Sequence, residues 1–406
     1  MTRARPGRGS TDPEADTGAV RRGDLRPWST HGDPVTITNV PSPEALRIAL
    51  VAPPWLPVPP DGYGGTERVV ALLADGLVAA GHDVVLFAAP GSRSRAEVVI
   101  PLAERPSLIG SAWGDEVFHV LTAMQHRDDF DVVHDHTGLG PALAAMTDGG
   151  PPVVHTLHGA WTPDNRRLFA RVHDRVALVA ISDAQRRENP RVGYAATVHN
   201  GIDVHAHPMG RRKDDYLVFV GRVSPDKGPE VAVEVAHRAG LPLVMIVKRG
   251  EPEEQAYWDE VVAPRLRGDE LVLEQPPHTV KVSLVARARA ALCPIDWPEP
   301  FGLVLAEALA CGTPVITRPL GAAPEIVLDG VTGFLCDTVD EMVAAVARAD
   351  RIRPEACREA VEARFSGAAM VAGYLAVYRA AVAARVGAVG LRRAGRLDLV
   401  GGVAAG

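Results

Sequence analysis

Short apolar segments alternate with amphipathic stretches along most of the chain. The clearest apolar segments are residues 47–52 (RIALVA) and 83–88 (DVVLFA), and an amphipathic helix is predicted over 67–80, ending before Gly81. Short apolar strands that alternate with helices predict a parallel sheet with helices on both faces, because such strands are buried on both sides. The pattern therefore predicts an α/β fold.

This alternation occurs in two series. The first series continues with predicted strands at residues 131–133, 152–156, 178–181 and 194–198. The second series begins at Tyr216, with predicted strands at residues 217–220, 243–247, 271–273, 291–293 and 315–317. Residues 205–214, between the two series, are polar and show no strand pattern, as is typical of a linker. We therefore predict two doubly wound, Rossmann-like domains, at 46–204 and 215–365, with a cleft between them.

The two ends of the chain lack this pattern. Residues 1–45 are rich in Pro, Gly, Asp and Arg without periodicity, which predicts a disordered N-terminal tail. Residues 366–386 predict an amphipathic, Ala-rich helix, and the Gly- and Arg-rich residues 387–406 predict a flexible tail.

The sequence predicts neither a secretory signal nor a membrane-spanning segment. The arginines near the N-terminus are not followed by the apolar core of about 7–15 residues that a secretory signal needs. No uninterrupted apolar run reaches the ~18 residues of a membrane span. We therefore expect a cytoplasmic protein without a transmembrane segment, and a peripheral membrane contact stays open.

Charge and cysteine content narrow the range of partners. The formal net charge is −7, from 43 basic and 50 acidic residues, so no basic excess suggests a nucleic-acid partner. An anionic substrate would need local cations. The cysteines show no CxxC spacing and lie in apolar settings, which indicates buried free thiols in a reducing compartment. They are Cys293, Cys311, Cys336 and Cys357.

Ligands of doubly wound sheets bind outside the carboxyl ends of the strands, so the loops after strands carry the candidate chemistry. The first such loop is residues 62–67 (GYGGTE), between the first strand and a helix. Gly64 and Gly65 would let the backbone approach a ligand closely, and the helix start offers free N–H groups to a phosphate. The GxGxxG dinucleotide fingerprint is absent. The alternative is a plain turn with Thr66 as the helix N-cap.

A second loop carries two cations. It is residues 221–228 (GRVSPDKG), directly after a strand of the second series. Arg222 can grip phosphate oxygens bidentately and Lys227 can act as a point charge, so together they could bind a diphosphate. The P-loop spacing GxxxxGK[ST] is absent. The alternative is that both side chains are solvated surface cations.

A third segment, residues 297–316, places two carboxylates in apolar surroundings. Glu299 precedes a helix predicted to begin near Phe301, and Glu307 lies inside that helix. A buried carboxylate needs a partner, either ligand hydroxyls or an arginine of the same fold. Eight helical residues rise about 12 Å, whereas the carboxyls of a retaining hydrolase lie about 5–5.5 Å apart. The pair therefore fits two sugar units of one extended ligand better than it fits a hydrolase.

Histidines follow two strands of the first series. Residues 134–137 (HDHT) could offer two histidines and an aspartate to zinc, but neighbouring positions on an extended chain alternate faces, and no other cluster supplies the remaining ligands. We therefore predict no metal site. His155 and His158 follow another strand and are candidates for the acceptor side or for structural histidines.

These motifs together resemble the retaining family-4 glycosyltransferases of the GT-B fold. Two glutamates separated by seven residues carry the resemblance, with Pro-Phe-Gly after the first and Gly-Thr-Pro-Val after the second. The segments 62–67, 221–228, 198–203 (VHNGID) and 323–326 (APEI) occur in the family's order. The resemblance extends from about residue 47 to about residue 379, which is nearly all of the chain between its tails.

The resemblance implies transfer of a sugar from a nucleoside diphosphate sugar to an acceptor, with retention at the anomeric carbon and without a metal or other cofactor. It also implies that the helix at 366–386 returns to the first domain. The donor sugar, the base and the acceptor (a small molecule, a glycan or a lipid-linked compound) stay open. Two other interpretations also stay open: a nucleotide-sugar epimerase of GT-B fold, and a non-catalytic protein that binds nucleotide sugars or glycans.

The resemblance further implies roles for the charged residues of the second domain. Arg222 and Lys227 would bind the donor diphosphate and stabilise it as it departs. Glu299 would hold hydroxyls of the transferred sugar, and Glu307 would bind the ribose.

Backbone groups and a histidine complete the implied site. Three N–H groups at the start of the helix would lie near sugar and phosphate, those of Phe301, Gly302 and Leu303. Gly64 and Gly65 would close over the phosphate from the first domain. His136 would lie beside the reacting sugar, with His134 as the alternative.

Overall fold

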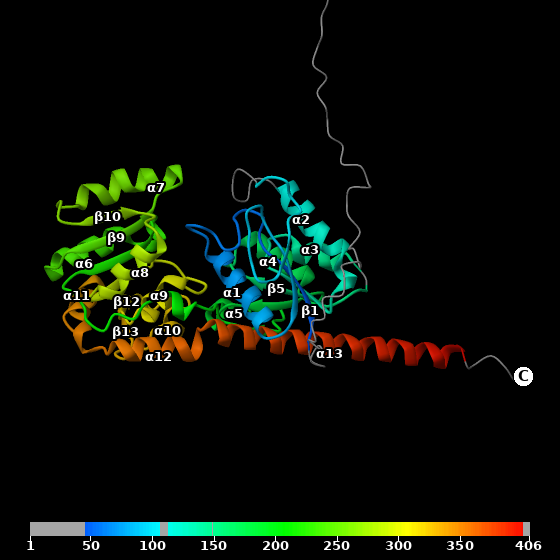
Figure 1. Cartoon of the computed structure of the whole chain (residues 1–406). Helices are drawn as coiled ribbons and strands as arrows, with labels where there is room; N and C mark the ends of the chain where they lie inside the picture. Colours follow the sequence, from blue (N-terminus) through cyan, green and yellow to red (C-terminus); the bar gives the residue numbers. More distant parts are fainter. Residues whose placement is uncertain (1–44, 106–112, 148, 401–406) are drawn as a thin grey trace, which may run out of the picture. The chain divides into compact units, whose positions relative to one another are not determined.

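The computed structural model describes residues 45–105, 113–147 and 149–400 (Figure 1). The tail predicted for residues 1–45 lies, except for Ala45, outside the described residues. The fold is α/β with two doubly wound parallel sheets, which confirms the predicted class.

Seven of the described strands form the first sheet, in the order β3-β2-β1-β4-β5-β6-β7, and every pair is parallel. They are β1 (Arg47–Val51), β2 (Asp83–Phe87), β3 (Glu97–Val99), β4 (Val132–Asp135), β5 (Val153–Leu157), β6 (Ala177–Ala180) and β7 (Ala196–Thr197). The short edge strand β3 is the one that the hydrophobic pattern does not predict. Glu97 is exposed and the two valines are only partly buried, so the strand carries little of the apolar signal of a central strand.

Six strands form the second sheet, in the order β10-β9-β8-β11-β12-β13, again with parallel pairs throughout the described residues. They are β8 (Leu217–Arg222), β9 (Leu243–Lys248), β10 (Leu271–Glu274), β11 (Ala290–Cys293), β12 (Val315–Thr317) and β13 (Gly333–Leu335). Strand β13 is also unpredicted, because it is three residues long and begins with glycine. In each sheet the strand order reverses at one point, between β1 and β4 in the first and between β8 and β11 in the second, and doubly wound sheets bind ligands at such points.

Helices connect the strands and cover the sheets (Figure 1). In the first domain they are α1 (Gly65–Ala79), α2 (Trp113–Gln125), α3 (Gly140–Ala145), α4 (Pro163–Val172) and α5 (Asp183–Glu188). In the second they are α6 (Pro229–Ala239), α7 (Pro252–Tyr257), α8 (His278–Arg287), α9 (Leu303–Ala310), α10 (Ala323–Ile326), α11 (Val339–Val346) and α12 (Pro354–Arg364). Local signals set several of the helix starts: Thr162 and Thr338 form capping boxes, and proline stands in the first turn of α4, α6 and α12.

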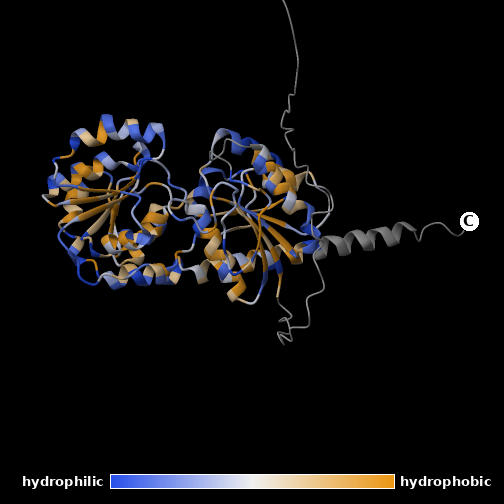
Figure 2. Cartoon of the chain, turned by 45° about the horizontal axis from the view of Figure 1, so that its top comes forward, coloured by the Kyte–Doolittle hydropathy of each residue, from blue (hydrophilic) through white to orange (hydrophobic). Residues whose placement is uncertain are grey.

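Apolar residues concentrate on the strands and on the inner faces of the helices (Figure 2). Each sheet has its own core, with Leu50, Leu73 and Leu86 fully buried in the first domain and Leu217 and Leu309 fully buried in the second. Burial of a leucine side chain contributes about 1.5–3 kcal/mol. Because each sheet has its own core, each series of strands forms a separate domain.

The last described helix, α13 (Gly367–Val400), packs its first turns against the first domain. Met370, Val371, Tyr374 and Tyr378 are buried in the same core cluster as α1, and a Cβ on Gly76 of α1 would lie 2.6 Å from Val371 Cγ2. The sequence predicts a flexible tail from residue 387, whereas the backbone is helical to Val400. Residues in this extension are mostly strong helix formers.

The apolar length of α13 differs from the sequence-based expectation. Within the described residues, Gly367–Arg385 is one helical segment long and apolar enough to cross a membrane. The segment holds no uninterrupted apolar run of membrane-spanning length, because Arg379 divides it. In this segment 28% of the window is buried, and its buried residues belong to the core of the first domain.

Glu325 of α10 connects the two domains. Its carboxylate accepts hydrogen bonds from the N–H groups of Asp183 (3.0 Å) and Ala184 (2.6 Å) in the first turn of α5, and from His199 Nε2 (3.0 Å). Burial raises the pKa of Glu325, but the hydrogen bonds from His199 and the two amides outweigh it and hold that pKa below 4.5. A carboxylate of the second domain therefore caps a helix of the first.

The segment predicted as a linker, residues 205–214, contacts the second domain. Lys213 Nζ donates hydrogen bonds to Ala286 O (2.7 Å) and Thr313 Oγ1 (2.8 Å), and the Asp214 N–H donates to Arg287 O (2.7 Å). These contacts hold the segment against α8.

Candidate active site

A cavity of about 740 Å³ lies at the carboxyl ends of the strands and is lined by residues of both domains. All nine residues predicted to bind the donor line it: Gly64, Gly65, Arg222, Lys227, Glu299, Phe301, Gly302, Leu303 and Glu307. His136 does not belong to the lining, whereas His158 does.

The glycine loop forms the first-domain side of the cavity. Gly64 is the N-cap of α1, so that Thr66 is the second residue of the helix and not its cap. Gly64 has φ 145°, a backbone conformation that other residues rarely adopt. A Cβ on Gly65 would lie 3.0 Å from Leu303 Cδ1 at the start of α9. The small residues thus allow the start of α1 to lie close to the second domain.

Lys227 and Glu299 are ion-paired with each other. Trp297 Nε1 donates a second hydrogen bond to Glu299 Oε2 (2.8 Å), and Lys227 Nζ lies 4.9 Å from the centre of the Trp297 ring. Both charged side chains keep access to solvent, with exposed fractions of 19% and 17%. Lys227, expected to bind the diphosphate, and Glu299, expected to bind the sugar, are therefore in direct contact with each other.

Further cations lie at the ends of β8 and β9. Arg222 Nη2 donates to Asp226 Oδ2 (3.1 Å), and Lys248 Nζ donates to Glu254 Oε2 (3.1 Å). Lys248 Nζ also lies 5.2 Å from the ring centre of Tyr63 in the glycine loop. With Lys227 and Lys281, they give the cavity four cations on its second-domain side.

Glu307 is paired with a lysine that the sequence analysis did not single out. Lys281 Nζ of α8 donates to Glu307 Oε2 (2.8 Å). Burial raises the pKa of Glu307, but the Lys281 charge, with His207 beside it, outweighs burial and holds that pKa below 4.5. The partner from its own fold is thus a lysine, where the sequence analysis considered an arginine. Glu307 and Lys281 both line the cavity, so a ligand can reach the pair.

The start of α9 points its free N–H groups toward the cavity wall. The helix begins at Leu303, two residues later than predicted, because Gly302 adopts a left-handed conformation (φ 88°) as its N-cap. The backbone of the preceding loop is held by Ala322, whose N–H donates to Glu299 O (2.9 Å). The positive end of this helix adds to the field that favours an anion here.

The structure separates the roles of His134 and His136. His134 is fully buried, and both of its ring nitrogens hydrogen-bond to protein groups, Nδ1 to Tyr378 Oη (2.6 Å) and Nε2 to Thr156 Oγ1 (2.8 Å). His136 Nδ1 hydrogen-bonds to His158 Nε2 (2.9 Å), while its Nε2 is buried without a partner among the described residues. Only His136 has a ring nitrogen left for another group.

Burial determines the charge of these histidines. It lowers the pKa of His158 to about 3 and holds the pKa values of His134 and His136 well below 6.5, with the neighbouring histidines adding to the effect. All three imidazoles are therefore neutral at pH 7. A neutral imidazole offers one donor and one acceptor.

Asp135 points away from this histidine pair. Its Oδ2 accepts a hydrogen bond from His155 Nδ1 (2.7 Å), and its Oδ1 accepts one from Thr137 Oγ1 (2.8 Å). Both His155 and Asp135 are buried and satisfied by these contacts. The alternation of faces predicted for residues 134–137 is confirmed, and His155 is a structural histidine.

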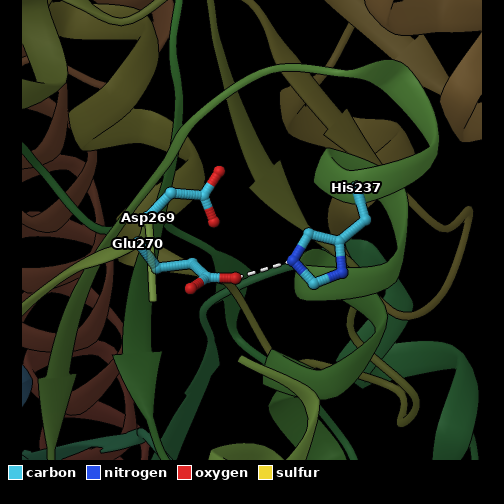
Figure 3. Close-up of side chains that lie close together, drawn as sticks. All are labelled: His237, Asp269 and Glu270. Carbon is cyan, nitrogen blue, oxygen red and sulfur yellow. Dashed lines mark hydrogen bonds and ion pairs between the residues drawn. The ribbon is translucent and has the colours of Figure 1, made fainter. Parts of the chain in front are cut away.

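Elsewhere in the described residues, one group of side chains has the spacing of metal ligands: His237, Asp269 and Glu270 (Figure 3). Glu270 accepts hydrogen bonds from His237 Nε2 (2.6 Å) and from the N–H groups of Arg267 and Gly268. The group lies before β10, at the amino end of the strand, whereas the cavity lies at the carboxyl ends. The hydrogen bonds of Glu270 explain why these side chains lie close together: its carboxylate caps the turn that begins at Arg267.

Sequence reasoning missed several cavity residues, for different reasons. Lys281 lies on a helix without a motif, and Trp297 was noted only as part of a segment. Lys248 directly follows the strand predicted at residues 243–247, and His158 was noted with a structural role as the alternative. A position directly after a buried strand was the available signal for the last two, since parallel strands end at the ligand-binding edge.

Comparisons with known proteins agree with this geometry. Two family models match the chain in succession, Glycosyltransferase Family 4 over residues 63–206 and Glycosyl transferases group 1 over residues 206–363. Their boundary falls at the start of the segment that separates the two sheets.

Curated relatives extend the match to most of the chain. Glycogen synthase of Mycobacterium tuberculosis (strain H37Rv) is 28% identical over 359 residues, covering 75% of this chain and 85% of that protein. Phosphatidyl-myo-inositol mannosyltransferase of Mycolicibacterium smegmatis is 29% identical over 331 residues, covering 74% and 84%. A solved glycosyltransferase involved in avilamycin A biosynthesis is 28% identical with a TM-score of 0.65, covering 84% of this chain and 98% of that one.

The two successive family models, the relatives that span both domains and the pair of doubly wound sheets lead to one assignment. The chain belongs to the glycosyltransferases of the group 1 and family 4 type and has the GT-B fold.

Proposed function

We propose that the protein transfers a hexose from a nucleoside diphosphate sugar to an acceptor hydroxyl, with retention at the anomeric carbon and without a metal ion or other cofactor. The observation that carries the proposal is the shared cavity, in which Arg222, Lys227 and Lys248 lie with the start of α9 and two carboxylates. Cations and a helix N-terminus favour a diphosphate, and carboxylates favour sugar hydroxyls.

The donor would be bound from the second domain. Its diphosphate would lie against Arg222, Lys227 and the N–H groups at the start of α9. Glu299 would then accept hydrogen bonds from hydroxyls of the transferred sugar, and Glu307 from those of the ribose. Because Lys227 and Glu299 are partly exposed, their ion pair can exchange for contacts with the donor at a modest cost.

Catalysis would rest on electrostatic stabilisation of the leaving group. As the bond between the anomeric carbon and the phosphate oxygen breaks, negative charge develops on the departing diphosphate beside the cations. The acceptor oxygen forms its bond to the anomeric carbon on the same face, and its proton passes to the departing phosphate oxygen. The lysine and arginine charges supply the positive field, so the proposed reaction needs no metal.

His136 would lie near the reacting sugar. Its support is the buried, unpartnered Nε2, which has a free donor or acceptor position while His134 has none. His158, its hydrogen-bond partner, lies on the cavity wall and would stand between His136 and bound ligands.

We place the reaction in the cytoplasm. All four cysteines are buried free thiols, as is common in reducing compartments. The acceptor is a small molecule, a glycan or a lipid-linked compound, and a peripheral membrane contact would suit the last of these.

The test measures release of nucleoside diphosphate from UDP-, GDP- and ADP-sugars, each with and without a mixed acceptor extract and each in the presence and in the absence of EDTA. Release with one donor should disappear in Arg222→Ala and Glu299→Ala but persist in the exposed controls Arg167→Ala and Glu359→Ala. The anomeric configuration of the product, determined by NMR, tests retention. Normal turnover in Glu299→Ala would contradict the assignment of the site.

Other outcomes separate the alternatives. Conversion of the donor sugar without any acceptor would indicate an epimerase. A raised melting temperature with a donor, but no release with any acceptor, would indicate a binding protein. Loss of activity with EDTA that is restored by a divalent cation would refute metal independence.

A further inference from the structure

Two tyrosines of α13 reach into the histidine cluster of the first domain. Tyr378 Oη lies 2.6 Å from His134 Nδ1, and Tyr374 Oη lies 2.9 Å from Thr156 Oγ1, which itself lies 2.8 Å from His134 Nε2. Both tyrosines are fully buried. They lie more than two hundred residues along the chain from the groups they bind, with separations of 244 and 218. The C-terminal helix thus supplies one hydrogen-bond partner of the His134 ring, Tyr378, and contacts the other partner, Thr156, through Tyr374.

The same imidazole contacts His136, the histidine predicted to lie near the reacting sugar. The rings of His134 and His136 have their centres 3.9 Å apart, and the Tyr374 ring centre lies 4.7 Å from that of His134. His136 in turn hydrogen-bonds to His158 on the cavity wall (2.9 Å). An unbroken series of contacts therefore runs from α13 to the cavity.

We propose that Tyr374 and Tyr378 are positioning residues of the transferase: they orient His134, and through its ring they hold His136 and His158 in place at the cavity. The proposal rests on the proposed function of the cavity. It gives the returning helix a role in the reaction, in addition to packing.

The physical reason is the hydrogen-bonding capacity of a buried neutral imidazole. Such a ring has one donor and one acceptor, and each must find a partner when water is absent. Removing the Tyr378 hydroxyl leaves Nδ1 of His134 without its partner, which favours a rotated ring or the other tautomer. Because the His136 ring packs on that of His134, its orientation then changes as well.

A purely structural role makes a different prediction. If the hydroxyls only help α13 to dock, their removal lowers stability and leaves turnover unchanged under conditions where the protein is folded. The control is Val377→Ala, since Val377 is buried in the same helix beside Tyr378 and contributes packing without a side-chain hydrogen bond.

The experiment compares Tyr378→Phe, Tyr374→Phe and Val377→Ala with the wild type well below their melting temperatures. Tyr378→Phe should lower kcat about tenfold or more, since a displacement of about 1 Å in a group that orients substrate can lower the rate about 10²-fold. The KM for the donor should change less than about twofold, because the hydroxyl does not line the donor side of the cavity. Val377→Ala should lower the melting temperature while keeping kcat within about twofold of the wild type.

A second readout does not depend on activity. In protein with ¹⁵N-labelled histidine, Tyr378→Phe should shift the ring signals of His134, His136 and His158, and Val377→Ala should leave them in place. Unchanged histidine signals in Tyr378→Phe would overturn the proposal whether or not transfer is found. Equal losses of kcat in Tyr378→Phe and Val377→Ala would also overturn it. An absence of transfer in the wild type would count against the proposed function instead, and the histidine signals would still decide the positioning.

Discussion

Gly321 lies in the loop between β12 and α10, against the backbone that carries Glu299. It has φ +56°, and a Cβ at this position would lie 2.6 Å from the carbonyl carbon of Pro298 and still closer to the backbone N and O of Glu299. Real Cβ atoms do not approach backbone atoms so closely. Gly321→Ala must therefore displace the Glu299 loop. Gly330 is the matched control, because it has φ +71° but no atom within 4 Å of an added Cβ.

Both substitutions introduce backbone strain, and only one of them also introduces a steric clash. An alanine forced into the left-handed region costs about 1–2 kcal/mol, which applies at both positions. Overpacking adds about 1–3 kcal/mol, and only Gly321→Ala has it. A displacement of about 1 Å in a residue that orients substrate can lower the rate about 10²-fold. We therefore expect kcat/KM to fall about 10²-fold in Gly321→Ala and to change little in Gly330→Ala.

The assay measures the melting temperature of both variants, and then donor binding and transfer at a temperature where both are folded. Gly321→Ala should melt at a lower temperature than Gly330→Ala and bind the donor more weakly. If the two variants have the same melting temperature and the same kcat/KM, the Glu299 loop does not depend on the close approach of Gly321, and the reasoning is refuted.

Three further predictions follow from the ion pairs and the buried groups. Glu325→Ala should destabilise the protein by about 2 kcal/mol at pH 7 relative to the exposed control Glu359→Ala, through loss of the hydrogen bonds to the first turn of α5. Because the pKa of Glu325 lies below 4.5 in the folded protein, this stabilisation is present above that pH, and the difference in melting temperature should vanish as the pH falls through the folded-state pKa. Lys281→Met should weaken donor binding about tenfold, measured by calorimetry, because burial then raises the pKa of Glu307; unchanged affinity would contradict this. Burial raises the pKa of Cys357 to about 12, so a maleimide at pH 7 should label it only after denaturation, and rapid labelling of Cys357 in the folded protein would be inconsistent with its burial.

The sequence was informative where local periodicity and burial coincide. Strands β1 and β2 are almost fully buried, so their continuous apolar segments predicted them within one residue. The strands β3 and β13 escaped prediction because they have three residues each, and pairing with a neighbour defines them more than their own composition does. The start of α9 was predicted two residues early, because a glycine in the left-handed region delays it.

For the site, the sequence showed which loops carry the candidate residues, but it did not show which charged residues form ion pairs. That Gly64, Arg222 and Glu299 follow strands is visible in the sequence, and parallel sheets bring such loops to one edge. The partner of each charge was not visible. The Lys227–Glu299 pair joins residues 72 apart, and the Lys281–Glu307 pair joins two helices. Such contacts depend on how helices and loops pack over the sheet.

The sequence by itself determined the α/β class, the two domains' series of strands and the loops that carry the chemistry, because these follow from short-range periodicity and from which residues suit a turn. Only the tertiary structure decided that His134 is satisfied by Tyr378 while His136 keeps a free nitrogen. His134 lies in β4 and His136 directly follows that strand, two residues further along, so no local pattern distinguishes them. What distinguishes them is a helix from the other end of the chain, whose position depends on the packing of both domains.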